Sequence, residues 1–298
     1  MRATLRTPVA GFSLVELAIV LFIVGILMLS LMSTLSSQVE QRNFDDTRRR
    51  LEQARELLLG FAIVNGRLPC PARSAATAIP VTAAGDEVRN AAGDCIGDAI
   101  TDYYGGVIAA GPPVVTGGFL PARSIGFQQT DAAGFAVDAW GNRIRYAVSG
   151  AVPINSPGPP SICRPLGVAP VAPHFTSATN LKANGIDCRP SDLLICKSTG
   201  VVPAMSAISC GGAPAGANQI MTQNLVVAII FSTGKNGATG GTGADEAANL
   251  DGQGNVNPAF VFHTPTPSTA ANGEFDDQFT WITVGELYGK LIAAGVLP

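Results

Sequence analysis

The chain reads GFSLVEL over residues 11–17 and then continues without a charged side chain from Leu17 to Val39. A helix needs about 20 apolar residues to cross the hydrocarbon core of a bilayer, so the length of this run suits a membrane span. Ahead of GFSLVEL the only charged side chains are Arg2 and Arg6. Because basic residues beside a short span stay in the cytoplasm, we predict a cytoplasmic N-terminus and an exported remainder.

Glu16 is the unusual residue of this segment. A carboxylate in an apolar span costs about 2.5–3.5 kcal/mol at mid-membrane and less near the interface, so such residues usually have a partner. If the chain is cleaved after Gly11, Phe12 gains a free α-amino group, and Glu16 lies about one helical turn from it. An acidic residue near a helix start also suits the helix dipole, but that effect alone does not explain the membrane cost.

A secretory signal peptide is the simplest alternative for this N-terminus. Its apolar region is shorter, about 7–15 residues, and it ends at a cleavage site made of small residues. The apolar run here is longer and has an acid near its start. These differences favour a retained membrane helix.

GFSLVEL, with its basic leader and apolar run, resembles the cleavage and methylation signature of type IV prepilins and type II secretion pseudopilins. In that family a membrane peptidase cuts after the glycine and N-methylates the new first residue. The resemblance therefore implies cleavage between Gly11 and Phe12, N-methylation of Phe12, and pairing of Glu16 with the amino terminus of a neighbouring subunit. The partners that it implies are other pilin-like subunits, a prepilin peptidase and an inner-membrane assembly platform.

The apolar run continues into a second, amphipathic helical segment. Phe44, Leu51 and Leu58 recur every seven residues, opposite a charged face, and the pattern stops at Asn65-Gly66. Fewer than three clear heptads are present, so we expect this segment to pack on the head and not to form a free coiled coil. The predicted organisation is a leader at 1–11, a membrane or filament-core helix at 12–39, a stem helix at 40–66 and an exported head at 67–298.

The head is rich in glycine and proline, and five segments in it have the pattern of a strand or a helix. We predict strands within 138–148, 224–232, 259–263 and 279–283, a helix over 284–294, and an irregular insertion over 151–173. The segments NGRLPCPA, DAWGNRIRYAV, STGKNG and DDQFTWIT resemble parts of larger minor pilins and pseudopilins. The resemblance implies an α+β, pilin-like fold, in which the long N-terminal helix packs on an antiparallel sheet.

The six cysteines point to disulfides because they follow an export-type N-terminus and form no C-x-x-C pair. Cys70 and Cys95 bracket one short loop, and we expect them to pair. The other four leave three pairings open, among which we favour two short loops. These loops are closed by Cys163–Cys188 and Cys196–Cys210.

Composition and motifs argue against catalysis and nucleic-acid binding. Hydrophobic residues make up 47% of the chain, charged residues 14%, and the net charge of −3 leaves no basic face for nucleic acid. The sequence has no G-x-S-x-G, H-E-x-x-H or phosphate-loop motif. Its two histidines, His174 and His263, are far apart in the chain, and we expect both to be surface or strand residues. We therefore expect a protein that is not an enzyme.

Acidic and amide side chains follow the buried strand near residue 232 and could bind calcium, which takes six to eight oxygen ligands. The candidate ligands are Asp245, Asp251, Asp276 and Asp277. Some secretion pseudopilins bind calcium at a similar place in the chain. The helix–loop–helix calcium pattern is absent, and ordinary turns use the same residue types, so a chain without a cofactor is the alternative.

These observations predict a structural subunit, a minor pilin or pseudopilin of a type IV pilus or a type II secretion pseudopilus. It would sit in the inner membrane with its head in the periplasm and then enter a filament. The alternative is a periplasmic binding or enzymatic domain on a single membrane anchor, with an N-terminus that imitates a prepilin. Cleavage after Gly11 distinguishes the two.

Overall fold

A computed structural model describes much of the chain in two compact units, Met1–Asp45 and Asp46–Pro298. The side chains of residues 28–37, of the two strands between 107 and 115 and of residue 239 are left out of the description. The described residues are 13–72, 85–89, 95, 107–108, 114–115, 118–154, 163, 174–191, 193–198, 209–211, 216–239, 243–250 and 258–297.

Helix α1 (Leu14–Asn65) has 52 residues and covers the stretch in which the sequence predicts continuous helix. Its end, from Asp46 onward, belongs to the second compact unit. Gly66 follows it with a φ of 68°, a left-handed conformation that glycine adopts without strain and that commonly ends a helix. Among the residues whose side chains are described, which leave out 28–37, no helix is both long and apolar enough to cross a membrane.

The head is α+β, and its strands form several small sheets. The central sheet has the order β10-β8-β3, from Gln278–Thr283, Val226–Ser232 and Arg145–Val148, and both of its pairings are antiparallel. The remaining strands are β1 (Val107–Ile108), β2 (Val114–Val115), β4 (Ala151–Pro153), β5 (Cys188–Pro190), β6 (Leu194–Cys196), β7 (Gln219–Met221) and β9 (Ala259–Val261).

The expected antiparallel sheet is present as β10-β8-β3, whereas another sheet of the head is mixed: β6 pairs antiparallel with β7 and parallel with β9. The expected irregular insertion begins instead with β4, which pairs with β5. Most of the remainder of 151–173 lies outside the described residues. The β6–β9 and β4–β5 pairings join segments that are distant in the chain, so local periodicity cannot predict them.

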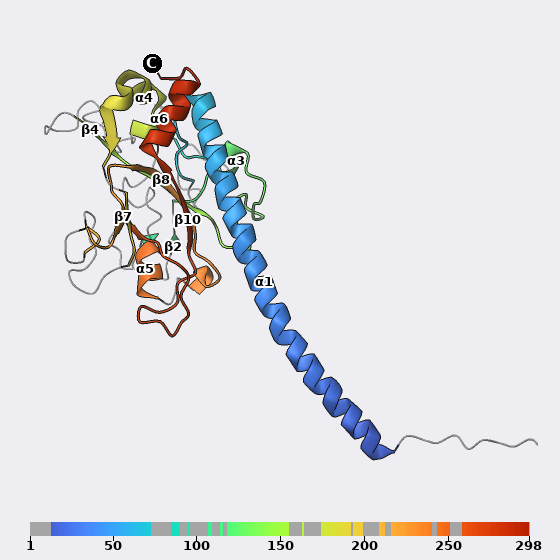
Figure 1. The fold of residues 1–298 in the computed structure, drawn as a ribbon. Helices are drawn as coiled ribbons and strands as arrows, with labels where there is room; N and C mark the ends of the chain where they lie inside the picture. The colour runs from blue at the N-terminus through green and yellow to red at the C-terminus, as the bar shows by residue number, and fades with distance from the viewer. Residues whose placement is uncertain are drawn as a thin grey trace, which may run out of the picture. The chain divides into compact units, whose positions relative to one another are not determined.

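The second part of α1 contributes its apolar stripe to the core of the head. Leu51, Ala54 and Leu58 are buried in one cluster with residues of the central sheet. Arg55 fixes the same segment: its Nε donates to the carbonyl of Trp281 at 3.1 Å, and its guanidinium lies 2.5 Å from the carboxylate of Glu286. Figure 1 shows the end of α1 beside α6 (Val284–Ala293), the helix that carries Glu286. The stem segment from Asp46 onward is thus an integral part of the head.

Short helices and three disulfides complete the head. The disulfides are Cys70–Cys95, Cys163–Cys188 and Cys196–Cys210, the pairing that the sequence analysis favours. The short helices are α3 (Ala122–Ile125), α4 (Ala178–Asn184) and α5 (Ala244–Leu250), with 3₁₀ turns η1 (His174–Thr176), η2 (Gly185–Asp187) and η3 (Gly237–Thr239).

His174 is fully buried, so the expectation of a surface or strand residue is wrong for it. Its Nδ1 lies 2.7 Å from the side-chain oxygen of Asn180, and its Nε2 lies 3.4 Å from the hydroxyl of Tyr288. That hydroxyl donates to the carbonyl of Cys188 at 2.6 Å. Burial lowers the pKa of His174, because the imidazolium form loses its hydration.

The lowered pKa of His174 predicts a pH-dependent stability. Above about pH 6.5 the histidine is neutral in both the folded and unfolded chains, and it adds no pH dependence. Below that pH the unfolded chain binds the proton first, so the free energy of unfolding falls as the pH drops toward the folded-state pKa. We expect His174→Gln to lose this part of the acid sensitivity. Urea unfolding of both proteins between pH 7.5 and 5 checks it, and parallel pH profiles would contradict it.

Candidate assembly motif and acidic cluster

The start of α1 is closed by a reciprocal pair of hydrogen bonds between Ser13 and Glu16. The backbone N–H of Ser13 donates to the carboxylate of Glu16 at 2.9 Å, and the backbone N–H of Glu16 donates to the hydroxyl of Ser13 at 3.2 Å. This arrangement is a capping box, which satisfies two N–H groups that the helix leaves unpaired. The S-x-x-E spacing was visible in the sequence, and it gives Glu16 a more specific local role than the helix dipole. Gly11 and Phe12 lie outside the described residues.

The first turns of α1 expose a continuous apolar surface. Every described side chain from Ser13 to Leu27 is exposed, and Leu14 and Phe22 keep 84% and 70% of their surface accessible. Glu16 is the only charged residue among them. Water is a poor environment for so much apolar surface, and such a surface normally contacts lipid or another protein.

Residues 6–32 match the family model of the prokaryotic N-terminal methylation motif. This is a prepilin-type N-terminus. The prepilin-type motif covers the GFSLVEL segment and most of the apolar run, and it points to pilin-like or pseudopilin processing and assembly. No curated protein and no solved structure matches the chain.

Later in the sequence than the prepilin-type motif, the head contains a buried cluster of three carboxylates. Glu246 lies on α5, and Asp276 and Asp277 directly precede β10. One carboxylate oxygen from each residue lies within 4.8 Å of the others, and all three side chains are buried. We call these three residues the acidic cluster.

Backbone and side-chain amide groups donate hydrogen bonds to this cluster. Glu246 accepts from the backbone N–H of Asp276 at 3.0 Å and from the side-chain amide of Asn236 at 2.9 Å. Asp277 accepts from the side-chain amide of Asn249 at 2.7 Å. Asp276 accepts from a backbone N–H through Oδ2, whereas its Oδ1 is buried without a hydrogen-bond partner in the described part of the chain.

Burial and mutual repulsion disfavour a negative charge on all three carboxylates of the acidic cluster. Burial, reinforced by the charge of Glu246, raises the pKa of Asp276 to about 7. Burial likewise raises the pKa of Asp277 well above its usual range. A divalent cation would relieve this cost, and a set of carboxylate oxygens is the donor type that calcium prefers. The unpaired Oδ1 of Asp276 fits the same explanation, so the residues are suited to calcium.

The structure brings together only some of the predicted calcium ligands. Asp276 and Asp277 share the acidic cluster, while Asp251 lies outside the described residues. Asp245 is engaged elsewhere: it accepts from Ser198 at 3.1 Å and lies 3.3 Å from Nε2 of His263.

Sequence analysis missed Glu246, which takes the place of its neighbour Asp245 in the cluster. Adjacent residues on a helix point in different directions, so only one of them can face a given site. The two acids stand side by side in the sequence at the start of α5, and only the orientation of that helix distinguishes them.

Proposed function

We propose that this chain is a structural subunit of a pilin-like filament, a minor pilin or pseudopilin of a type IV pilus or type II secretion pseudopilus. The match of residues 6–32 to the N-terminal methylation motif is the observation that carries the proposal. The exposed apolar start of α1 supports it, because assembly through that helix would cover the surface. In this proposal residues 12–39 hold the subunit in the inner membrane until it is cleaved and assembled.

The head of such a subunit needs no catalytic group. We propose that it acts as a rigid exported body, and the three disulfides suit an oxidising compartment such as the periplasm. The alternative function is a periplasmic domain on a single membrane anchor. That alternative predicts an uncleaved N-terminus.

Processing is the direct test of the proposal. We expect mature protein extracted from membranes to begin at N-methyl-Phe12, and Gly11→Val to prevent this cleavage because a branched side chain would enter the peptidase site. N-terminal mass spectrometry reads both outcomes. Gly25→Ala is the matched control, since an added methyl group there meets nothing within 4 Å. Wild-type protein that starts at Met1 or beyond the apolar run would contradict the proposal.

We also propose that the acidic cluster holds a calcium ion. Glu246, Asp276 and Asp277 would supply carboxylate oxygens, and the bound charge would offset their mutual repulsion. This role concerns the stability of the head and is independent of processing at the N-terminus.

A further inference from the structure

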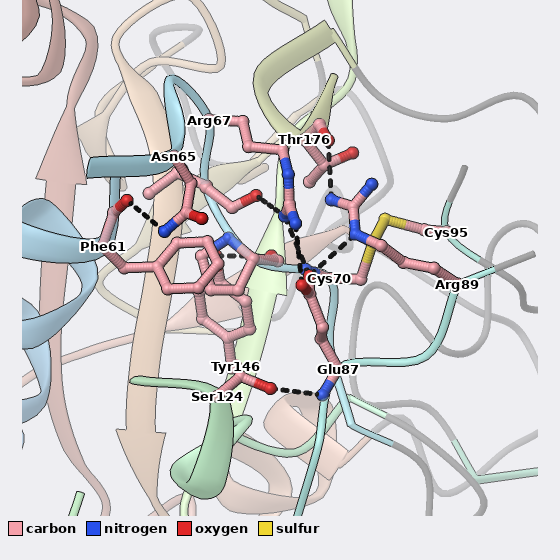
Figure 2. A network of polar contacts seen from close by, with 12 residues as sticks. Phe61, Asn65, Arg67, Cys70, Glu87, Arg89, Cys95, Ser124, Tyr146 and Thr176 are labelled. Atoms are coloured by element: carbon pink, nitrogen blue, oxygen red, sulfur yellow. Dashed lines mark hydrogen bonds and ion pairs between the residues drawn. A yellow bond between two sulfur atoms is a disulfide. The ribbon is translucent and has the colours of Figure 1, made fainter. Parts of the chain in front are cut away.

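A second charged cluster lies at the exit of α1, beside the Cys70–Cys95 disulfide. The carboxylate of Glu87 receives both terminal nitrogens of Arg67, at 2.9 and 2.8 Å, and Nε of Arg89 at 2.9 Å. The three side chains are largely buried, with 15–16% of their surface exposed. Figure 2 shows Glu87 between the two arginines, with the disulfide next to them. We call these three residues the Glu87 cluster.

The Glu87 cluster holds the backbone at both cysteines. The backbone N–H of Cys70 donates to Oε2 of Glu87 at 3.0 Å, and the same oxygen accepts from Arg67 and Arg89. Arg89 in turn pairs with Cys95 in an antiparallel backbone bridge. The carboxylate therefore contacts the backbone of Cys70 directly and is linked to Cys95 through Arg89.

Other parts of the head hold this carboxylate in place without help from the disulfide. The backbone N–H of Glu87 donates to the hydroxyl of Ser124 at 2.8 Å, and the guanidinium of Arg89 donates to the carbonyl of Thr176 at 2.8 Å. Arg67 lies over the ring of Phe61 on α1, 5.2 Å from its centre. These contacts come from four separate segments of the chain, and none of them includes a sulfur atom of the disulfide.

The length of the loop between two cysteines favours the native disulfide over other pairings only weakly, so correct pairing needs such guidance. Six cysteines allow 15 pairings, and the entropy of loop closure changes slowly with loop length. The native loops span 25, 25 and 14 residues, so two of them are equal in length. A structure that already holds two cysteines together raises their local concentration and removes most alternatives.

We propose that the Glu87 cluster guides the oxidation of Cys70 and Cys95 into their disulfide. The oxidant is a small or protein disulfide of the exported compartment. The thiolate of one cysteine attacks it, which forms a mixed disulfide, breaks the oxidant's S–S bond and releases half of the oxidant as a thiolate that takes up the proton lost by the cysteine. The thiolate of the second cysteine then attacks the mixed disulfide, which closes Cys70–Cys95 and releases the other half of the oxidant as a thiolate that is protonated in the same way.

The first test measures pairing during refolding. Full-length protein is reduced and unfolded, returned to detergent buffer with oxidised and reduced glutathione, quenched at intervals and mapped as non-reduced peptides. We expect Glu87→Gln to slow the appearance of Cys70–Cys95 at least threefold and to increase the mispaired forms of Cys70. The matched control is Asp131→Asn, which loses a carboxylate paired with Arg143 at 2.8 Å in a contact that includes neither cysteine. Equal rates in Glu87→Gln and Asp131→Asn would overturn the proposal.

The second test asks whether the cluster forms without the disulfide, and it does not depend on the folding of Glu87→Gln. In the double variant Cys70→Ser/Cys95→Ser, the amide of residue 70 should still exchange its hydrogen slowly, because it donates to Glu87. Adding Glu87→Gln to that variant should accelerate exchange at this amide at least tenfold. Free exchange at residue 70 in the double variant would show that the disulfide holds the cluster, and this would reverse the proposed order.

Discussion

Replacing Glu16 by valine should remove the subunit from filaments while leaving its expression, membrane insertion and cleavage largely intact. Valine enters the bilayer more readily than a carboxylate, so insertion becomes easier. Assembly should suffer because the α-amino group of Phe12 on a neighbouring subunit, whose charge survives methylation, would lose its acidic partner. We expect at least a tenfold decrease of the variant in the filament fraction.

The capping box makes a sharper comparison possible. Glutamine in place of Glu16 can still accept the N–H of Ser13 and keep the box, but it lacks the charge. Ser13→Ala keeps the charge and removes one of the two cap bonds, at a cost of about 0.5–2 kcal/mol. If pairing with a neighbour is the essential role, Glu16→Gln should fail like Glu16→Val, and Ser13→Ala should assemble.

Sheared surface filaments, or an overproduced pseudopilus, can be blotted for the subunit beside the membrane fraction. The membrane fraction controls for expression and cleavage. Equal incorporation of wild type and Glu16→Val would remove Glu16 from the assembly mechanism. Failure of Ser13→Ala with normal incorporation of Glu16→Gln would reduce its role to helix capping.

Bound calcium should raise the free energy of unfolding of the head, and hence its Tm, by an amount that calorimetry can measure. A ligand present at a hundred times its dissociation constant stabilises the folded state by about 2.7 kcal/mol. For a unit of this size each kcal/mol raises Tm by about 2–4 °C, so we expect an increase of about 5–10 °C over chelator-treated protein. Differential scanning calorimetry of the full chain in detergent, with and without added calcium, measures it.

Variants of neighbouring acids assign this effect to the acidic cluster. Asp277→Asn keeps the size of the side chain but removes a charge from the cluster, and it should abolish most of the calcium-induced rise in Tm. Asp245→Asn is the matched control, since Asp245 is bonded to Ser198 outside the cluster, and it should keep the rise. The comparison uses the calcium-induced difference for each protein, so general destabilisation cancels. A Tm that calcium leaves unchanged in the wild type would exclude the site.

Local patterns predicted much of the fold. The absence of proline and the seven-residue apolar repeat predicted one continuous helix, and α1 runs from Leu14 to Asn65. The apolar run before STGKNG predicted β8, and DDQFTWIT predicted β10, because a strand needs only a short stretch with suitable side chains and turn signals. The closing helix α6 agrees equally well with its expected segment.

Contacts between distant segments were beyond this reasoning. The parallel pairing of β6 with β9 and the choice of Glu246 over Asp245 both depend on how far-apart elements meet. The Glu87 cluster and its contacts at Ser124 and Thr176 bring together segments that lie far apart in the chain, which the sequence pattern does not predict. His174 was misassigned for the same reason, because its burial depends in part on Tyr288, which lies 114 residues away in the chain. Its other neighbour, Asn180, forms no recognisable motif with it.

The burial of apolar side chains from the second part of α1 affects how a soluble fragment of this protein should be designed. A fragment that starts at residue 67, where the helix has ended, would lack Leu51, Leu58 and Leu59, each of which is at least 98% buried. Burial of one leucine contributes about 2 kcal/mol, so the three together contribute about 6 kcal/mol, as much as the whole stability of many domains. Such a fragment would expose the core side chains that these leucines cover, and we expect it to aggregate. A truncation point upstream of Asp46 retains the helical segment that covers this part of the core.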